Sequence, residues 1–139
     1  MIIKVLAYVT RGEAENREIL VFHHRDYPEA GVQVIGGTVE TNEDLEIALL
    51  REIEEESGLS ELEMVGEIAT VRRFSPNHNE WQERHFFHLR AGTDLPASWQ
   101  HVVSKGDRDE GLVFCFEWWP IEHAANEQMD GKQDFVRAL

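Results

Sequence analysis

Short apolar stretches bounded by glycine, proline and polar turn residues recur along this chain, a pattern that predicts β-strands. The apolar start of the chain predicts the first strand, and a turn around Gly12 separates it from the second. The third strand is expected to run into a glycine turn at Gly36 and Gly37. The longest polar segment, 91–111, is predicted to be a loop, and long loops in compact domains are often functional. Strands are predicted over six ranges: 2–10, 18–24, 32–37, 63–74, 84–89 and 112–119.

A helix is predicted between the third and fourth strands. Thr41 and Asp44 resemble a capping box at its start. The helix is expected to run to about Ser57, because Gly58 suits the left-handed position that ends a helix. Strands interrupted by one helix and followed by another favour a mixed α/β or α+β sandwich over a regularly alternating parallel fold. The length fits one domain covering the whole chain, 1–139. Closing helical segments are predicted over two ranges: 121–129 and 134–139.

The end of the predicted helix is strongly acidic, with the sequence REIEEESGL at 51–59. That end of a helix ordinarily favours basic residues, so stability alone does not explain this pattern. At about 100° per residue, Glu52, Glu55 and Glu56 share one sector that extends the apolar stripe. Glu54 falls on the opposite face. Burying neighbouring carboxylates without a partner is costly, and a hard divalent cation such as Mg²⁺ would offset that cost. A solvated acidic face is the alternative that the pattern leaves open.

Composition adds limits on the kind of partner. The formal net charge of −14 argues against general nucleic-acid binding and against binding to anionic membranes. The segment from Glu40 to Glu63 carries ten acidic residues and one basic residue, so the acidity is concentrated around the predicted helix. The apolar start is too short to span a bilayer and lacks the features of a signal peptide. With Cys115 as the only cysteine, no internal disulfide is expected, and a cytoplasmic location is the default expectation.

Residues before the acidic turn have a regular spacing to it: Gly37 stands six positions before Glu43, and REIEEESGL begins eight positions after Glu43. This spacing resembles the signature of the Nudix hydrolases. That signature is Gly, five residues, Glu, seven residues, then Arg-Glu-apolar-any-Glu-Glu-any-Gly-apolar. One departure precedes the motif, where VIGG stands at 34–37 in place of the PGG-type turn that the family often has. Residues 37–59 meet every position of the signature: Gly37, Glu43, Arg51, Glu52, Ile53, Glu55, Glu56, Gly58 and Leu59.

The resemblance implies a single-domain α/β/α sandwich around a mixed β-sheet. It also implies hydrolysis of a nucleoside diphosphate linked to another group. Glu52, Glu55 and Glu56 would hold divalent metal ions, Mg²⁺ or Mn²⁺, with help from the backbone carbonyl of Gly37. Arg51 would orient a carboxylate, and the i,i+4 spacing favours Glu55 for this contact. Metal ions of this kind assist the attack of water at phosphorus, and Glu52 or Glu56 is expected to accept the water proton.

Further side chains are candidates for roles around this site. By the same resemblance, Glu43 would support the site from the start of the helix. Family members often recruit one more acid from a later loop or strand, and Glu110, which ends the long loop, is the first candidate to test. The four acids considered are Glu83, Asp107, Asp109 and Glu110. Bases near predicted strand ends are candidates for contacts with substrate phosphates, with ordinary surface positions as the alternative. These bases are Arg25, Arg73 and Arg84.

The sequence therefore leaves three functions to compare. The first is a divalent-metal-dependent Nudix pyrophosphohydrolase acting on a nucleotide or a nucleotide derivative. The second is a Nudix-fold nucleotide-binding or regulatory module without turnover, and the third is an acidic domain that binds metal only for stability. The complete motif favours the enzyme, because a purely binding domain has no chemical need for three aligned glutamates and Arg51. The expected partner is a small nucleotide-type molecule, and a homodimer formed through sheet edges stays open.

Overall fold

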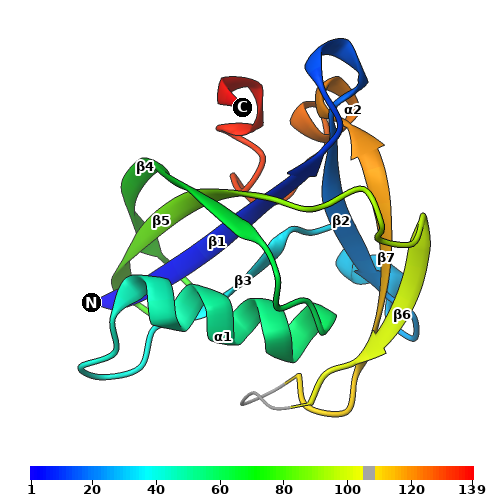
Figure 1. The fold of residues 1–139 in the computed structure, drawn as a ribbon. Coiled ribbons are helices and arrows are strands. Elements are labelled where there is room, and N and C mark those ends of the chain that lie inside the picture. Colours follow the sequence, from blue (N-terminus) through cyan, green and yellow to red (C-terminus); the bar gives the residue numbers. More distant parts are fainter. Residues whose placement is uncertain (105–108) are drawn as a thin grey trace.

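The computed structural model describes residues 1–104 and 109–139, and its framework is a seven-stranded mixed sheet (Figure 1). Along the sheet the strand order is β4-β5-β1-β2-β7-β6, and β3 pairs with β1 off this path. The strands are β1 Ile2–Arg11, β2 Glu18–His24, β3 Ile35–Thr38, β4 Glu63–Ser75, β5 Glu80–Arg90, β6 Ser98–Val102 and β7 Val113–Pro120. The α-helices are α1 Leu45–Ser57 and α2 Ile121–Ala125, with 3₁₀ turns at Ala14–Asn16, Pro28–Ala30 and Val136–Ala138.

The strand β1 organises the sheet because it pairs with three neighbours. It runs parallel to β5 over nine residue pairs, from Ile2↔Gln82 to Thr10↔Arg90. On its other edge, the first half of β1 pairs antiparallel with β3, whereas its last two residues pair with β2. The sheet therefore divides along β1, and β3 occupies the space between β1 and the diverging β2.

Side chains of β1 alternate between two hydrophobic cores, as the period of a strand requires. Val5, Ala7 and Val9 belong to the core that α1 covers, whereas Leu6 and Tyr8 belong to the core closed by α2 and the C-terminal turn. Figure 1 shows α1 crossing one side of the sheet, with α2 and the C-terminus away from it. The predicted α/β/α sandwich around a mixed sheet is confirmed.

The helix α1 begins and ends close to the predicted positions. The carboxylate of Asp44 accepts a 2.9 Å hydrogen bond from the backbone N–H two residues on, and Gly58 ends the helix with φ 80°. The prediction that Thr41 shares in the cap is wrong, because Thr41 is exposed in a turn. That turn is closed instead by Glu43, whose carboxylate accepts a 2.9 Å hydrogen bond from the Glu40 N–H.

Three further expectations need correction. The segment 91–111 is not a loop throughout, because it contains β6, whose Trp99 stacks on Phe116 of β7 at 5.1 Å between ring centroids. Gly36 and Gly37 lie within β3, paired with β1, and do not form a turn. The closing helical segments are shorter than expected, since α2 has five residues and the second is a three-residue 3₁₀ turn. In the part of the chain that the structure describes, no helix is long and apolar enough to cross a membrane.

The packing of α1 against the sheet generates a prediction about stability. Leu49 is completely buried on the sheet side of α1, whereas its neighbour Leu50 is 47% exposed. Leu49→Ala is expected to lower the free energy of unfolding by about 2–5 kcal/mol, through lost burial and the cavity left behind. Leu50→Ala is the matched control and is expected to stay within about 0.5 kcal/mol of wild type. Urea unfolding of both variants checks this, and equal losses would contradict the assigned orientation of α1.

Candidate active site

The acidic face of α1 lies directly against the backbone of β3. A Cβ atom placed on Gly37 would lie 2.1 Å from the Glu52 Cδ, so only glycine admits the Glu52 carboxylate at this position. The neighbouring Gly36 donates its backbone N–H to Glu56 Oε1 at 3.3 Å. Glycine is needed here for close approach, since neither residue has the positive φ that a glycine turn would require.

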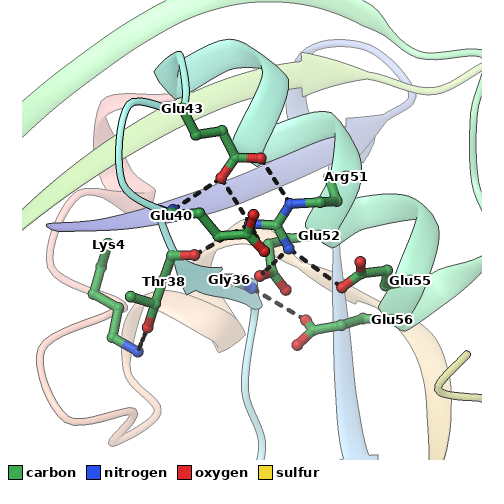
Figure 2. A network of polar contacts seen from close by, with 9 residues as sticks. All are labelled: Lys4, Gly36, Thr38, Glu40, Glu43, Arg51, Glu52, Glu55 and Glu56. Carbon is green, nitrogen blue, oxygen red and sulfur yellow. Dashed lines mark hydrogen bonds and ion pairs between the residues drawn. The ribbon is translucent and has the colours of Figure 1, made fainter. Parts of the chain in front are cut away.

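Arg51 ties the carboxylates of this region together. Its guanidinium donates to both carboxylate oxygens of Glu43, at 2.8 and 2.9 Å. It also reaches Glu52 Oε1 at 3.0 Å and Glu55 Oε2 at 3.4 Å. Figure 2 shows the guanidinium at the centre of these contacts, with a further hydrogen bond to the carbonyl of Thr38 at 3.2 Å. The expected contact with Glu55 is present, and the shortest and bidentate contact is with Glu43.

This network fixes the protonation state of Glu43. The hydrogen bonds from Arg51, and then the one from the Glu40 N–H, lower the pKa of the Glu43 carboxyl to about 2. The Arg51 pKa is raised, chiefly by its hydrogen bond to Glu43. Glu43 is therefore an anion that holds Arg51, and Arg51 in turn contacts Glu52 and Glu55.

Glu52 and Glu56 lie in a less favourable environment. Burial is the largest cause that raises the pKa of Glu52, to about 7, with the Glu55 charge adding to it and the Arg51 charge opposing it. Burial also raises the pKa of Glu56 well above its ordinary value, and the charge of Glu52 is the next cause. Glu56 is 6% exposed, and the Glu52 side chain 12%. Both carboxylates are desolvated, so each is costly to ionise without a neighbouring cation.

The end of α1 is completed by residues that the sequence did not single out. The His101 Nε2 of β6 donates to the Glu55 carbonyl at 3.1 Å, and the Ser104 N–H donates to the same oxygen at 3.3 Å. The Trp99 indole donates to the Ser57 carbonyl at 3.2 Å. These donors satisfy carbonyls that a helix end leaves unpaired. Trp99 and His101 alternate with the exposed residues of β6, and this period of two was the feature of the sequence that could have predicted the strand.

The candidates for a further acid are spread over the structure. Glu83 is held by Arg72 at 2.7 Å and by His85 at 2.7 Å, within the sheet and apart from the motif. Asp109 lies where its charge raises the pKa of Glu56, whereas Glu110 is an exposed turn residue with no contact to the motif among the described residues. Asp107 lies outside the described residues. The assignment of Glu110 stays a prediction, and Asp109 has the stronger electrostatic connection.

The three candidate arginines do not form one group. Arg73 and Arg84 both contact Asp130, with ion-pair distances of 3.2 Å each. Arg84 is buried, at 6% exposure, and lies beside Lys4 on the neighbouring strand β1. Arg25 is half exposed and pairs with the adjacent Asp26 at 3.2 Å, without contact to the motif in the described part of the chain.

The donor set around Gly37 fits a hard divalent cation. Carboxylate and backbone carbonyl oxygens are the ligands that Mg²⁺ and Mn²⁺ prefer. Arg51 contacts Glu52 and Glu55, whereas Glu52 and Glu56 are the desolvated carboxylates. A bound cation would offset the burial and the repulsion that raise the pKa values of Glu52 and Glu56. Across residues 1–104 and 109–139, no three His, Cys, Asp or Glu side chains are already gathered as a metal-binding group. Binding would therefore draw these carboxylates closer together.

Comparison with known proteins agrees with this geometry. A family model described as the NUDIX domain matches residues 2–139. The chain belongs to the Nudix family. No curated protein matches the chain by sequence. The family match covers the motif at 37–59 together with all of the sheet.

Solved structures share this Nudix fold at low sequence identity. The Ap4A hydrolase of C. elegans, in a binary complex, is 15% identical, with 99% of this chain and 93% of that chain covered and a TM-score of 0.71. The dihydroneopterin triphosphate pyrophosphohydrolase of E. coli is 17% identical over 99% and 93%, with a TM-score of 0.66. The NUDIX domain of Shewanella oneidensis NrtR, solved with ADP ribose, is 16% identical over 97% and 83%, with a TM-score of 0.66.

The Gly37 contact predicts the effect of adding one methyl group to the Nudix motif. In Gly37→Ala, the new Cβ overlaps the Glu52 carboxylate, so Glu52 is expected to move away from β3. The rise in melting temperature caused by Mg²⁺ should then be largely lost. The matched control is Gly31→Ala, where the added Cβ meets no atom within 4 Å. That control lowers stability through its positive φ and should keep the Mg²⁺ effect. A Gly37→Ala protein with wild-type response to Mg²⁺ would contradict the role of this contact.

The raised pKa of Glu52 predicts a pH effect on the metal-free protein. Because the folded-state pKa of about 7 exceeds the ordinary value of 4.5, protonation of Glu52 favours the folded state. This stabilisation is complete below about pH 4.5 and is lost as the pH rises through about 7. Between these limits wild type should lose on the order of 2 kcal/mol more than Glu52→Gln. Urea unfolding in chelator at pH 5 and pH 8 measures this, with Glu54→Gln on the exposed face keeping the wild-type slope.

Proposed function

We propose that this Nudix protein is a divalent-metal-dependent pyrophosphohydrolase that cleaves a nucleoside diphosphate linked to another group. The observation that carries the proposal is the packing of the Glu52 carboxylate on the Gly37 backbone, beside the buried Glu56 and within reach of Arg51. A helix built for stability alone would not place desolvated carboxylates against a strand. Metal-assisted hydrolysis of a pyrophosphate would explain it, because that reaction needs closely spaced carboxylates to bind the metal ions.

Each residue of the motif has a role in this proposal. Glu52, Glu55 and Glu56, with the Gly37 carbonyl, hold Mg²⁺ or Mn²⁺. Such an ion, when bound, neutralises phosphate oxygens and makes water a better nucleophile. Arg51 keeps the Glu52 and Glu55 side chains in place through contacts of 3.0 and 3.4 Å. Glu52 and Glu56 are the two carboxylates proposed to accept the proton of the attacking water.

The comparisons support the reaction class at a coarse level. The names of two similar structures, an Ap4A hydrolase and a dihydroneopterin triphosphate pyrophosphohydrolase, both describe phosphate compounds as substrates. The NUDIX domain of NrtR was solved with ADP ribose. The second candidate function is therefore nucleotide binding without turnover, and it is tested beside hydrolysis. At identities of 15–17% these likenesses support the class of ligand and leave the substrate to experiment.

A screen for hydrolysis products, in which phosphomonoester products are detected after phosphatase treatment, tests the proposal. Nucleoside triphosphates, nucleotide sugars, ADP-ribose, dinucleoside polyphosphates and capped RNA would be offered with Mg²⁺ or Mn²⁺. Wild type is expected to cleave at least one class, and Glu52→Gln should lower the rate by at least about 100-fold. Glu54→Gln is the matched control, since Glu54 is exposed on the opposite face of α1 and should keep full activity.

Two outcomes would contradict the proposal. Glu52→Gln with wild-type turnover would remove the motif from the reaction. Tight binding of a nucleotide without release of any product by wild type, across the whole screen and with both metals, would identify the protein as a binding module.

A further inference from the structure

Basic side chains gather beside the acidic motif, although the chain as a whole is strongly acidic. Only three of the 139 residues are lysines, and two of them, Lys4 and Lys132, lie here. Lys4 of β1 is registered with Arg84 of β5 on one side and with Thr38 of β3 on the other. Neighbouring strands lie about 4.8 Å apart, so Lys4 and Arg84 emerge close together. A cross-strand pair of like charges is destabilising unless another group compensates it.

The second lysine is presented by a fixed C-terminal segment. The carbonyl of Asp130 accepts hydrogen bonds from Arg73 at 2.8 Å and from Arg84 at 2.6 Å. Asp130 and Gly131 both have positive φ, of 54° and 80°, and this turn directs the Asp130 carbonyl to the two guanidinium groups. The Tyr8 hydroxyl donates to the Lys132 carbonyl. The backbone on both sides of Lys132 is therefore anchored to the sheet before any ligand binds.

Among residues 1–104 and 109–139, neither lysine has a carboxylate partner. None of the ion pairs among the described residues includes Lys4 or Lys132. The Lys4 ammonium donates to the Thr38 hydroxyl at 2.7 Å, and the Lys132 ammonium donates to Gln33 Oε1 at 3.4 Å. An ammonium has three donors, so these neutral acceptors leave most of the hydrogen-bonding capacity of both lysines available.

Burial and nearby positive charges make the charged forms of Lys4 and Lys132 less favourable. Burial is the largest cause that lowers the pKa of Lys4, and the Arg84 charge lowers it further. Burial likewise lowers the pKa of Lys132, and the charges of Arg84 and Lys4 act in the same direction. An anion bound near these two partly desolvated ammonium groups would reduce their repulsion.

The position of the two lysines connects them to the Nudix motif. The charge of Glu52 acts on Lys4, and the charge of Glu56 acts on both lysines. Figure 2 shows Lys4 reaching Thr38 at the margin of the same network that holds Glu52 and Glu56. Arg73 and Arg84, which the sequence offered as substrate-binding residues, are occupied with Asp130 and act here as positioning residues for Lys132.

We propose that the ammonium groups of Lys4 and Lys132 bind the phosphates that extend beyond the pyrophosphate held at the three glutamates. The substrate is then a nucleotide with three or more consecutive phosphates. This inference rests on the proposed function, because it places the scissile pyrophosphate at Glu52, Glu55 and Glu56. A nucleotide sugar has only the two phosphates at the glutamates, and so nothing to neutralise the lysines.

Anion binding can be measured without turnover. Inorganic tripolyphosphate, pyrophosphate and phosphate are titrated into the protein in chelator at constant ionic strength, by calorimetry and by shift of the melting temperature. Wild type should bind tripolyphosphate more tightly than the two shorter anions. Lys132→Gln and Lys4→Gln should each weaken that binding by about tenfold, the effect of one charge-assisted contact. Arg90→Gln is the matched control, since it removes the same charge at the exposed far end of β5.

Variants that keep the wild-type melting temperature are then compared in turnover. Lys132→Gln should raise KM for a nucleoside triphosphate and for a dinucleoside polyphosphate by about tenfold, with kcat nearly unchanged. KM for ADP-ribose or a nucleotide sugar, where cleaved, should stay within about twofold of wild type. Lys132→Arg keeps the charge and should restore most of the affinity.

The results separate this inference from the proposed function. If wild type cleaves nucleotide sugars or ADP-ribose in preference to triphosphates, and both lysine variants bind tripolyphosphate as wild type does, the phosphate-chain site is overturned while the hydrolase stands. If tripolyphosphate binding depends on both lysines and no substrate is cleaved, the anion site stands and the hydrolase is overturned. Equal weakening by Arg90→Gln would assign the binding to overall charge and overturn the site.

Discussion

The close contact between α1 and β3 is the constraint on which the rest of the structure depends. A Cβ on Gly36 would lie 2.7 Å from the Leu6 side chain and 2.8 Å from the Val5 carbonyl, and one on Gly37 would overlap Glu52. The two glycines thus let β3 press against β1 on one side and admit a carboxylate on the other. The split of the sheet along β1 gives β3 its place there. The desolvation of Glu52 and Glu56 follows from this packing, because their carboxylates lie on backbone instead of in water.

The negative charges of α1 are compensated only in part within the helix. Arg51 is the only base in α1, and it contacts Glu43, Glu52 and Glu55. The backbone carbonyls at the end of α1, which have no partner within the helix, accept hydrogen bonds from β6 and the residues after it. These donors lie more than 40 positions later in the chain. These donors pair the backbone carbonyls at the end of α1 but do not neutralise its carboxylate side chains. The carboxylate side chains still repel one another. Binding of a divalent cation would reduce this repulsion.

Local features of the sequence were sufficient to predict α1, most strands and the grouping of the glutamates. Helical periodicity places Glu52, Glu55 and Glu56 on one face, and Gly58 ends the helix as expected. What the sequence did not reveal depends on contacts between distant segments. The strand β6 has one half-buried apolar residue, Trp99, and one exposed apolar residue, Val102, and is recognisable only once β7 lies beside it. The site of Lys132 likewise depends on a turn anchored by two arginines that lie 46 and 57 residues away in sequence.

In the part of the chain that the structure describes, groups of opposite charge lie close to β3 without forming ion pairs with each other. The carboxylates of Glu52 and Glu56 repel one another, and so do the ammonium groups of Lys4 and Lys132. Direct pairing between the two sets would relieve both repulsions, yet the lysines contact the neutral oxygens of Thr38 and Gln33. In our proposal, a ligand that combines a divalent cation with a chain of phosphates would supply a partner to each set and stabilise this arrangement. Repulsion between like charges favours binding of such a ligand, because the ligand would remove an electrostatic cost that the folded protein otherwise carries.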